Sequence, residues 1–238
     1  MIDIKDFVDF HSHILPGVDH GSDSMETTLF QLKSAKKKGI HKIVSTSHFY
    51  PTAHSIDVFL KKRNDAYGAL LECCEEIPEI LLGAEVLLCN GLDRLSGLDK
   101  LCISGTRYLL LELPFSDYSE EYTDTLKRLI NDGFSVILAH ADRYQRSIIE
   151  KLLNIGVKLQ LNADALVGIK KIKNKYLFDW ISCGSVVALG SDIHGKDARA
   201  YTRLRKAFRT AAKLSDVVLT ESNKIFNESK RQSKKHKV

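Results

Sequence analysis

Short apolar runs alternate with longer amphipathic segments along most of the chain, and this alternation limits the fold more than any other feature of the sequence. Seven runs are predicted to be buried strands, and most of them are apolar at consecutive positions, as in parallel strands covered on both faces; they span residues 7–10, 42–46, 81–88, 108–113, 135–140, 157–162 and 186–192. Amphipathic helical patterns lie between or after them, at residues 25–39, 56–76, 119–133, 144–156, 175–184 and 198–214. The alternation predicts an α/β fold with a parallel sheet, either open and doubly wound or closed into a barrel.

The charge, the termini and the cysteines narrow the range of functions. The net charge of +5 comes partly from the C-terminal stretch KRQSKKHKV, for which we expect a solvated end, with contact to an anionic membrane or an acidic partner as the alternative. No aromatic residue interleaves with these bases, so we expect no nucleic-acid partner. The N-terminal stretch MIDIKDFVDF resembles neither a signal peptide nor a membrane span. Five cysteines without CxxC spacing predict free thiols and a cytoplasmic protein.

Metal-capable side chains gather at the ends of the predicted strands. Six of the seven strands carry them at or near the carboxyl end, namely His11 and His13, His48, Glu85, Glu112, His140, and Asp192 with His194. In (β/α) barrels that end is where active sites are built. Alternate strand residues point to the same side, so His11 and His13 can face one ion together. One such residue alone is more often structural, but the joint pattern over six strands predicts a metal centre.

The types of ligand indicate the chemistry. Glu85 and Glu112 lie in otherwise apolar strands, where an unpaired carboxylate is costly unless a cation or water is beside it. A mixed histidine and carboxylate set suits Mn, Zn, Fe, Co or Mg, and eight or nine ligands are too many for one ion, which predicts two or three. Clustered divalent ions suit hydrolysis of phosphate esters. Arg143 and Arg199 follow ligand positions and are candidates for clamping the phosphate, with a surface role at a helix start as the alternative.

Six stretches of the chain carry a family resemblance, in the order DFHSHILPGVDHGS, STSHFY, LLGAEVLL, LLLELP, LAHADR and GSDIHGKDAR. Together they resemble the PHP (polymerase and histidinol phosphatase) superfamily, and within it the bacterial tyrosine-protein phosphatases of capsular and exopolysaccharide operons. The resemblance implies a single phosphatase domain over residues 1–228, folded as a distorted, seven-stranded (β/α) TIM-like barrel. Residues 229–238 are expected to form a basic, disordered tail.

The resemblance also implies a function and a set of ligands. It implies a metal-dependent protein-tyrosine phosphatase with a three-metal cluster, usually of manganese, which acts on phosphotyrosine of a membrane-associated tyrosine autokinase that controls polysaccharide export. Carried over by motif, His11 and His13 bind one ion and Glu112 bridges to a second. The cluster is completed by His48, Glu85, His140, Asp192 and His194. Arg143 and Arg199 stand where the phosphate-binding arginines of the family stand.

The chain departs from the family pattern in three motifs. Where the family has the second acid of a DDG motif as a ligand, this chain has His20, which we expect to coordinate, with Asp19 as the fallback. The family's TPHH is TSHF here and its HPER is HADR, but His48, His140 and Arg143 are kept. These changes alter loops and the rim of the pocket, so they affect substrate preference more than metal binding.

Other functions fit the sequence less well. A small-molecule phosphoesterase, such as a histidinol-phosphate phosphatase, is the alternative within the same superfamily; short loops after the first and fifth strands favour an open site and thus a protein substrate. A cysteine-dependent tyrosine phosphatase needs a C-x5-R loop, which the sequence lacks. A non-catalytic scaffold predicts missing ligands, whereas each expected position holds a metal-capable residue. A proofreading exonuclease would require a basic, aromatic groove. The oligomeric state is not predicted.

Overall fold

The computed structural model describes residues 7–74, 76–114, 118–168 and 174–235. Its strands are β1 (Val8–Ser12), β2 (Lys42–Ser45), β3 (His48–Phe49), β4 (Glu79–Leu82), β5 (Glu85–Leu87), β6 (Tyr108–Glu112), β7 (Ser135–Leu138), β8 (Lys158–Asn162) and β9 (Val186–Gly190). Every ladder between them is parallel, so the predicted parallel α/β fold is confirmed. The strands form two sheets, one of order β1-β2-β4 and one of order β3-β5-β6-β7-β8-β9.

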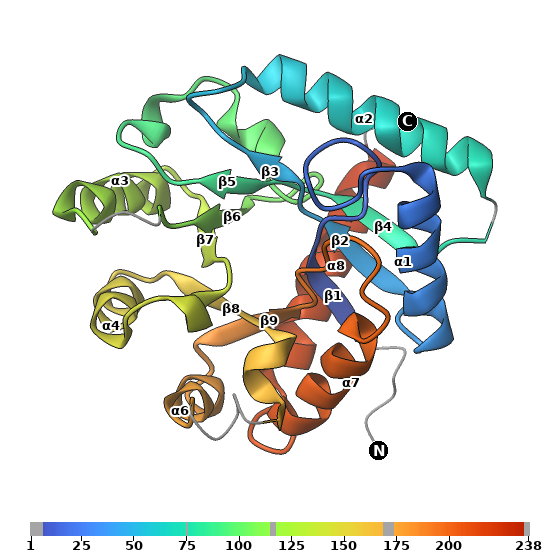
Figure 1. The fold of residues 1–238 in the computed structure, drawn as a ribbon. Helices are drawn as coiled ribbons and strands as arrows, with labels where there is room; N and C mark the ends of the chain where they lie inside the picture. The colour runs from blue at the N-terminus through green and yellow to red at the C-terminus, as the bar shows by residue number, and fades with distance from the viewer. Residues whose placement is uncertain (1–6, 75, 115–117, 169–173, 236–238) are drawn as a thin grey trace.

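The strands follow one another around a ring, with most helices on its outer side (Figure 1). A single closed sheet of seven strands is not observed, because no ladder among the described strands joins β2 to β3 or β1 to β9. The run 81–88, predicted as one strand, is divided into β4, which pairs with β2, and β5, which pairs with β3. The chain passes from one sheet to the other at Gly83, whose N–H donates to the Ser45 carbonyl at 2.8 Å.

The described helices are α1 (Met25–Lys37), α2 (Ile56–Cys73), α3 (Glu120–Asn131), α4 (Arg146–Asn154), α6 (Tyr176–Ser182), α7 (Ala200–Ala211) and α8 (Val217–Lys235). Short 3-10 turns lie at Leu92–Arg94, Leu98–Leu101, Ala141–Arg143 and Ala163–Leu166. The first six helices lie where the amphipathic patterns predicted them. Ser24 and Ser55 cap α1 and α2 by accepting from backbone N–H groups of the first turn. None of the helices in the described ranges is both long and apolar enough to cross a membrane.

Helix α8 corrects the expected boundary of the C-terminal tail. It continues through Lys235, so residues 229–235 belong to a helix instead of a separate disordered segment; residues 236–238 lie outside the described residues. The Ser229 hydroxyl donates to the Ser104 carbonyl, and Lys230 Nζ lies 2.6 Å from Glu79 Oε1. These contacts attach the start of the basic stretch to the body of the protein.

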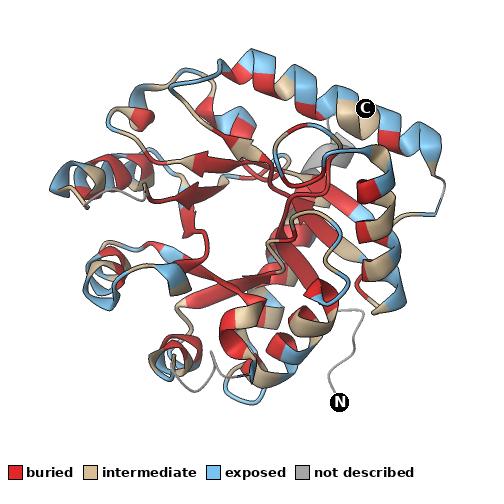
Figure 2. Ribbon diagram, in the orientation of Figure 1, coloured by how far each residue is buried: buried red, intermediate tan, exposed pale blue. Residues whose placement is uncertain are grey.

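Two apolar clusters form the core. The larger one lies between the strands and the surrounding helices, and the strands are accordingly buried along most of their length (Figure 2). The smaller one combines strand side chains with the fully buried Ile225 and Phe226 of α8; its strand members include Val8, Phe10, Val44, Leu81, Leu110, Ile137 and Val187. Helix α8 is therefore part of the core, and the strand ends that carry the histidines are left for the polar site.

Candidate metal centre

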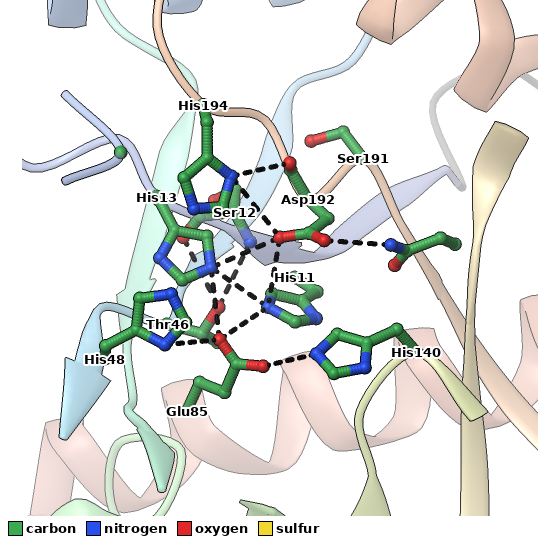
Figure 3. A network of polar contacts seen from close by, with 12 residues as sticks. His11, Ser12, His13, Thr46, His48, Glu85, His140, Ser191, Asp192 and His194 are labelled. Atoms are coloured by element: carbon green, nitrogen blue, oxygen red, sulfur yellow. Dashed lines mark hydrogen bonds and ion pairs between the residues drawn. The ribbon is translucent and has the colours of Figure 1, made fainter. Parts of the chain in front are cut away.

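The predicted ligands converge at the carboxyl side of the strands (Figure 3). They line or lie beside a cavity of about 450 Å³, whose wall includes His20, His48, Tyr50, Glu85, Leu87, Glu112, Pro114, His140, Arg143, Asp192 and His194. His11 and His13, at the end of β1, are fully buried beneath it. The sequence prediction that these strand ends meet in space therefore agrees with the arrangement of the side chains.

Glu85 lies at the centre of the cluster. Its Oε2 atom is 3.2 Å from His11 Nε2, 3.3 Å from His13 Nε2 and 3.0 Å from His48 Nδ1. Its other oxygen accepts a hydrogen bond of 2.7 Å from His140 Nε2. The family resemblance implies that Glu112 bridges two ions, and this stays a prediction; in this structure Glu85 is the carboxylate that lies between the β1 histidines and His48.

Ligand atoms gather in three overlapping groups. The groups are His13, His48 and His194; His11, His13 and Asp192; and His48, Glu85 and Glu112. Within each group the ligand atoms all lie within 4.8 Å of one another. Glu112 adds its oxygens at 3.9 Å from His48 Nδ1 and 3.4 Å from His140 Nε2. Because the groups share His13 and His48, the geometry suits neighbouring cations more than one isolated ion.

Several buried polar atoms of this cluster lack a partner, which tests the fit of a cation. Among the described residues, Glu85 Oε2, His48 Nδ1 and His194 Nε2 are buried without a hydrogen bond. Glu85 Oε2 and His48 Nδ1 lie 3.0 Å apart, which is an ion pair when His48 is protonated, whereas His194 Nε2 makes no ion pair within the described part of the chain. Leaving such groups unpaired costs about 1–3 kcal/mol each. Divalent ions held by the overlapping groups would give these atoms partners, so the donor set fits a metal centre.

The electrostatic balance of the site favours ionised carboxylates. Burial alone would raise the pKa of Glu85 and Asp192, but the neighbouring histidines hold the pKa of both well below the usual range. Burial would lower the pKa of His140, but hydrogen bonds to Glu112 and Glu85 raise it to about 9. Burial lowers the pKa of His194 to about 4. His194 is thus neutral at pH 7, whereas binding of a cation at His140 would require that histidine to lose a proton.

Two predicted ligands have strained backbone. His140 and Asp192 are the only described residues other than glycine with positive φ, at 32° and 49°. The Asp192 N–H donates to the His11 carbonyl at 2.8 Å. The fully buried Asp9 accepts from both the backbone N–H and the hydroxyl of Ser191, at 2.7 and 2.6 Å, and so fixes the preceding residue. Such strain is concentrated at functional sites in proteins.

Two glycines allow the ligand strands to approach closely. A Cβ atom on Gly190 would lie 2.4 Å from His11 Cβ, and one on Gly21 would lie 2.0 Å from His13 Cβ. Any side chain at these positions would displace the β1 histidines. The glycines in DHGS and ALGSD therefore serve the site directly.

Strand β8 supplies polar residues that the sequence analysis did not identify. The fully buried Gln160 accepts at Oε1 from His11 Nδ1 at 3.0 Å and from the His140 N–H at 2.6 Å. Its amide donates to Asn162 Oδ1 at 3.1 Å, and Asn162 Nδ2 donates to Asp192 Oδ2 at 2.9 Å. Because His11 Nδ1 donates to Gln160, His11 Nε2 is the nitrogen that faces the cluster. The only available signal was the pair of amides at alternate positions in KLQLN.

Asp19 and His20 occupy different positions around the cluster. Asp19 lies behind His13 and accepts from its Nδ1 at 2.8 Å, and from the His48 N–H at 2.9 Å. His20 is exposed at the cavity rim, with its ring centroid 4.8 Å from that of His48 and 4.7 Å from that of His194. Neither residue belongs to the three ligand groups found among the described residues. Coordination by His20 stays a prediction.

The two predicted phosphate-binding arginines differ in position. Arg143 lines the cavity, and its Nη2 atom bonds to Asp192 Oδ2 while the side chain stays 43% exposed. Arg199 is exposed at the start of α7, and it is not among the residues that line this cavity. The structure therefore brings Arg143 to the site, and the role of Arg199 stays a prediction.

Comparison with known proteins identifies relatives over nearly the whole chain. Residues 7–230 match the family described as capsular polysaccharide synthesis, CpsB/CapC. The tyrosine-protein phosphatase CpsB of Streptococcus pneumoniae is 26% identical over 240 residues, covering 92% of this chain and 98% of that protein. The tyrosine-protein phosphatase YwqE of Bacillus subtilis is 25% identical over 205 residues, covering 82% of this chain and 80% of that protein.

A solved structure has a similar fold. It comes from work on YwqE from Bacillus subtilis and CpsB from Streptococcus pneumoniae, described as unique metal-dependent tyrosine phosphatases. The TM-score is 0.72 and the sequence identity 21%, with 90% of this chain and 95% of that chain covered. At this identity the likeness supports the fold, and the arrangement of the site rests on the side chains described above.

Proposed function

The chain belongs to the CpsB/CapC family of capsular polysaccharide synthesis, and we propose that it is a metal-dependent protein-tyrosine phosphatase. The observation that carries the proposal is the convergence of histidines and carboxylates from β1, β3, β5, β6, β7 and β9 on one cavity. The relatives named as tyrosine-protein phosphatases support the choice of substrate.

We propose that two or three divalent ions, manganese first among them, are held by His11, His13, His48, Glu85, Glu112, His140, Asp192 and His194, with His20 as a further ligand at the rim. Bound ions would supply Lewis acidity to the phosphate and lower the pKa of a water for in-line attack. Fe, Zn, Co and Mg are the alternatives with the same donor set.

The other residues of the cavity bind and orient the substrate. Arg143 lines the cavity with its guanidinium bonded to Asp192, and it offers further N–H donors to phosphoryl oxygens. Leu87, Pro114 and the ring of Tyr50 form less polar parts of the wall, where the aromatic ring of a phosphotyrosine can pack. Gln160 holds His11 in the orientation that presents Nε2. We retain Arg199 as a second phosphate-binding candidate.

The proposed biological substrate is phosphotyrosine on a membrane-associated tyrosine autokinase that controls capsule or exopolysaccharide synthesis. Family membership supports this context. The five cysteines are all free, which suits a reducing, cytoplasmic environment.

The test is phosphate release by purified protein after chelation and after readdition of manganese. A phosphotyrosine peptide, a phosphoserine peptide and histidinol phosphate are compared, with Glu85→Gln as the site variant and the exposed Glu76→Gln as its control. We expect metal-dependent release from the phosphotyrosine peptide by the wild type and Glu76→Gln only. Release of phosphate from histidinol phosphate alone would support the metal centre and contradict the assignment of phosphotyrosine as the substrate.

A further inference from the structure

A second cavity, which we call the α2 cavity, opens beside the metal centre. It has a volume of about 210 Å³, and its wall includes Val18, Tyr50, His54, Val58, Phe59 and Lys62. It shares His20, His48 and Tyr50 with the cavity of the metal centre. A substrate that places its phosphate at the metal centre therefore has the α2 cavity directly beside it.

The wall of the α2 cavity is mostly apolar and includes an unusual surface residue. Val58 is 60% exposed, and it is one of three large hydrophobic residues that are exposed in the described part of the chain. Phe59, the next residue of α2, is buried beneath, and the Tyr50 ring stacks on His48 with centroids 5.4 Å apart. This wall can cover the methylene groups of a bound side chain.

Lys62 provides the accessible charge of the α2 cavity. Its ammonium group donates to the Val18 carbonyl at 3.0 Å, which fixes it at the wall and leaves two N–H donors free for another acceptor. The other charged group of the wall, Asp19, is almost fully buried and already accepts from His13, His48 and Gly21. Lys62 is therefore the group of this wall that can donate to an incoming carboxylate.

We propose that the α2 cavity is a substrate subsite that receives an acidic side chain close to the phosphotyrosine of a protein substrate. The inference rests on the proposed phosphatase function and adds a sequence preference to it. The carboxylate accepts from Lys62, and its methylene groups contact Val58 and Tyr50. A glutamate suits this wall better than an aspartate because it has one more methylene group to cover.

The test compares three substrates: p-nitrophenyl phosphate, a phosphotyrosine peptide flanked by glutamates, and the same peptide flanked by lysines. We expect a kcat/KM about tenfold higher for the glutamate peptide than for the lysine peptide, because the glutamate gains one charge-assisted hydrogen bond from Lys62. Lys62→Glu is expected to remove or reverse that ratio and to leave p-nitrophenyl phosphate hydrolysis unchanged. Lys61→Glu, one residue away on α2 and outside the cavity wall, is the matched control and should keep the wild-type ratio.

The outcomes separate the subsite from the phosphatase function. The subsite is overturned if the two peptides have equal kcat/KM values, or if Lys62→Glu and Lys61→Glu change the ratio equally. In either case, hydrolysis of p-nitrophenyl phosphate would still support the phosphatase function. If no substrate is hydrolysed with any added metal, the proposed function fails. Peptide binding measured by fluorescence anisotropy then still decides the subsite, because the glutamate preference and its loss in Lys62→Glu need no turnover.

Discussion

Gln160 Oε1 accepts the Nδ1–H of His11 at 3.0 Å, and the same oxygen accepts the backbone N–H of His140 at 2.6 Å. One amide oxygen thus fixes two predicted ligands that come from different strands. It also orients His11 so that Nε2 points to Glu85. Outer partners of this kind determine the orientation and basicity of metal-binding histidines.

Replacing Gln160 is expected to weaken metal binding. In Gln160→Leu both N–H donors lose their acceptor, and we expect metal affinity to fall about 10- to 100-fold. Isothermal titration of the chelated protein with manganese measures the change. Gln145→Leu, at an exposed position before α4, is the matched control. Equal affinities for the two variants would show that Gln160 does not position the ligands.

The sequence predicted which histidines and carboxylates converge better than it predicted the residues that surround them. His11, His48, His140 and Asp192 were found because histidine and aspartate are conspicuous at the ends of apolar strands. Gln160 was missed because an amide in a half-polar strand such as KLQLN has many ordinary explanations. The sequence also did not show that Glu85 is the carboxylate at the centre of the cluster. That depends on strand register and side-chain direction, which the spacing of residues along the chain does not determine.

The same limit applies to the fold. The parallel α/β class followed from the apolar runs. The break at Gly83 was missed because it lies inside the largely apolar run 81–88, and it depends on which strand each half of that run pairs with. Helix α8 was missed because its second half is rich in charged residues and its apolar positions are few. The exposed position of Arg199 could not be read from its distance along the chain to Asp192.

Metal binding is expected to stabilise the folded protein. His194 Nε2 and Glu85 Oε2 are buried without a hydrogen bond, and a bound ion would give each of them a partner. At a free ion concentration of 100 times Kd, the free energy of unfolding should rise by about 2.7 kcal/mol. Urea unfolding with manganese and with a chelator measures the difference. Glu85→Gln should lose most of the increase and Glu76→Gln should keep it; an equal increase in both would place the binding site elsewhere.

Arg143 is expected to contribute more to phosphate binding than Arg199. Arg143→Met removes a cationic donor that lines the cavity, and we expect kcat/KM for a phosphotyrosine peptide to fall about 10- to 100-fold, as for a lost charged hydrogen bond of about 2 kcal/mol. Arg199→Met should cause a smaller loss because that side chain is exposed and outside the cavity wall. A larger loss in Arg199→Met would reverse this order.

The cysteines are expected to differ in reactivity. Burial raises the pKa of the Cys102 thiol to about 12, whereas Cys73 and Cys183 are exposed. A thiol reagent at pH 8 should modify the two exposed cysteines rapidly and reach Cys102 only after unfolding, as peptide mapping would show. Because the folded thiol keeps its proton after the unfolded one has lost it, this group makes stability fall as pH rises above about 9. Rapid native modification of Cys102 would contradict its burial.

Helix α8 is expected to be essential for stability although a solvated tail was predicted from residue 229 onward. Phe226 is fully buried with strand side chains in the smaller core cluster, so Phe226→Ala should lower the free energy of unfolding by about 3–5 kcal/mol. Leu214→Ala, at a residue that is 42% exposed, is the control and should cost far less. Urea unfolding of both variants in the presence of chelator separates this effect from metal binding. If the two variants were equally stable, Phe226 would not contribute to the core as its burial indicates.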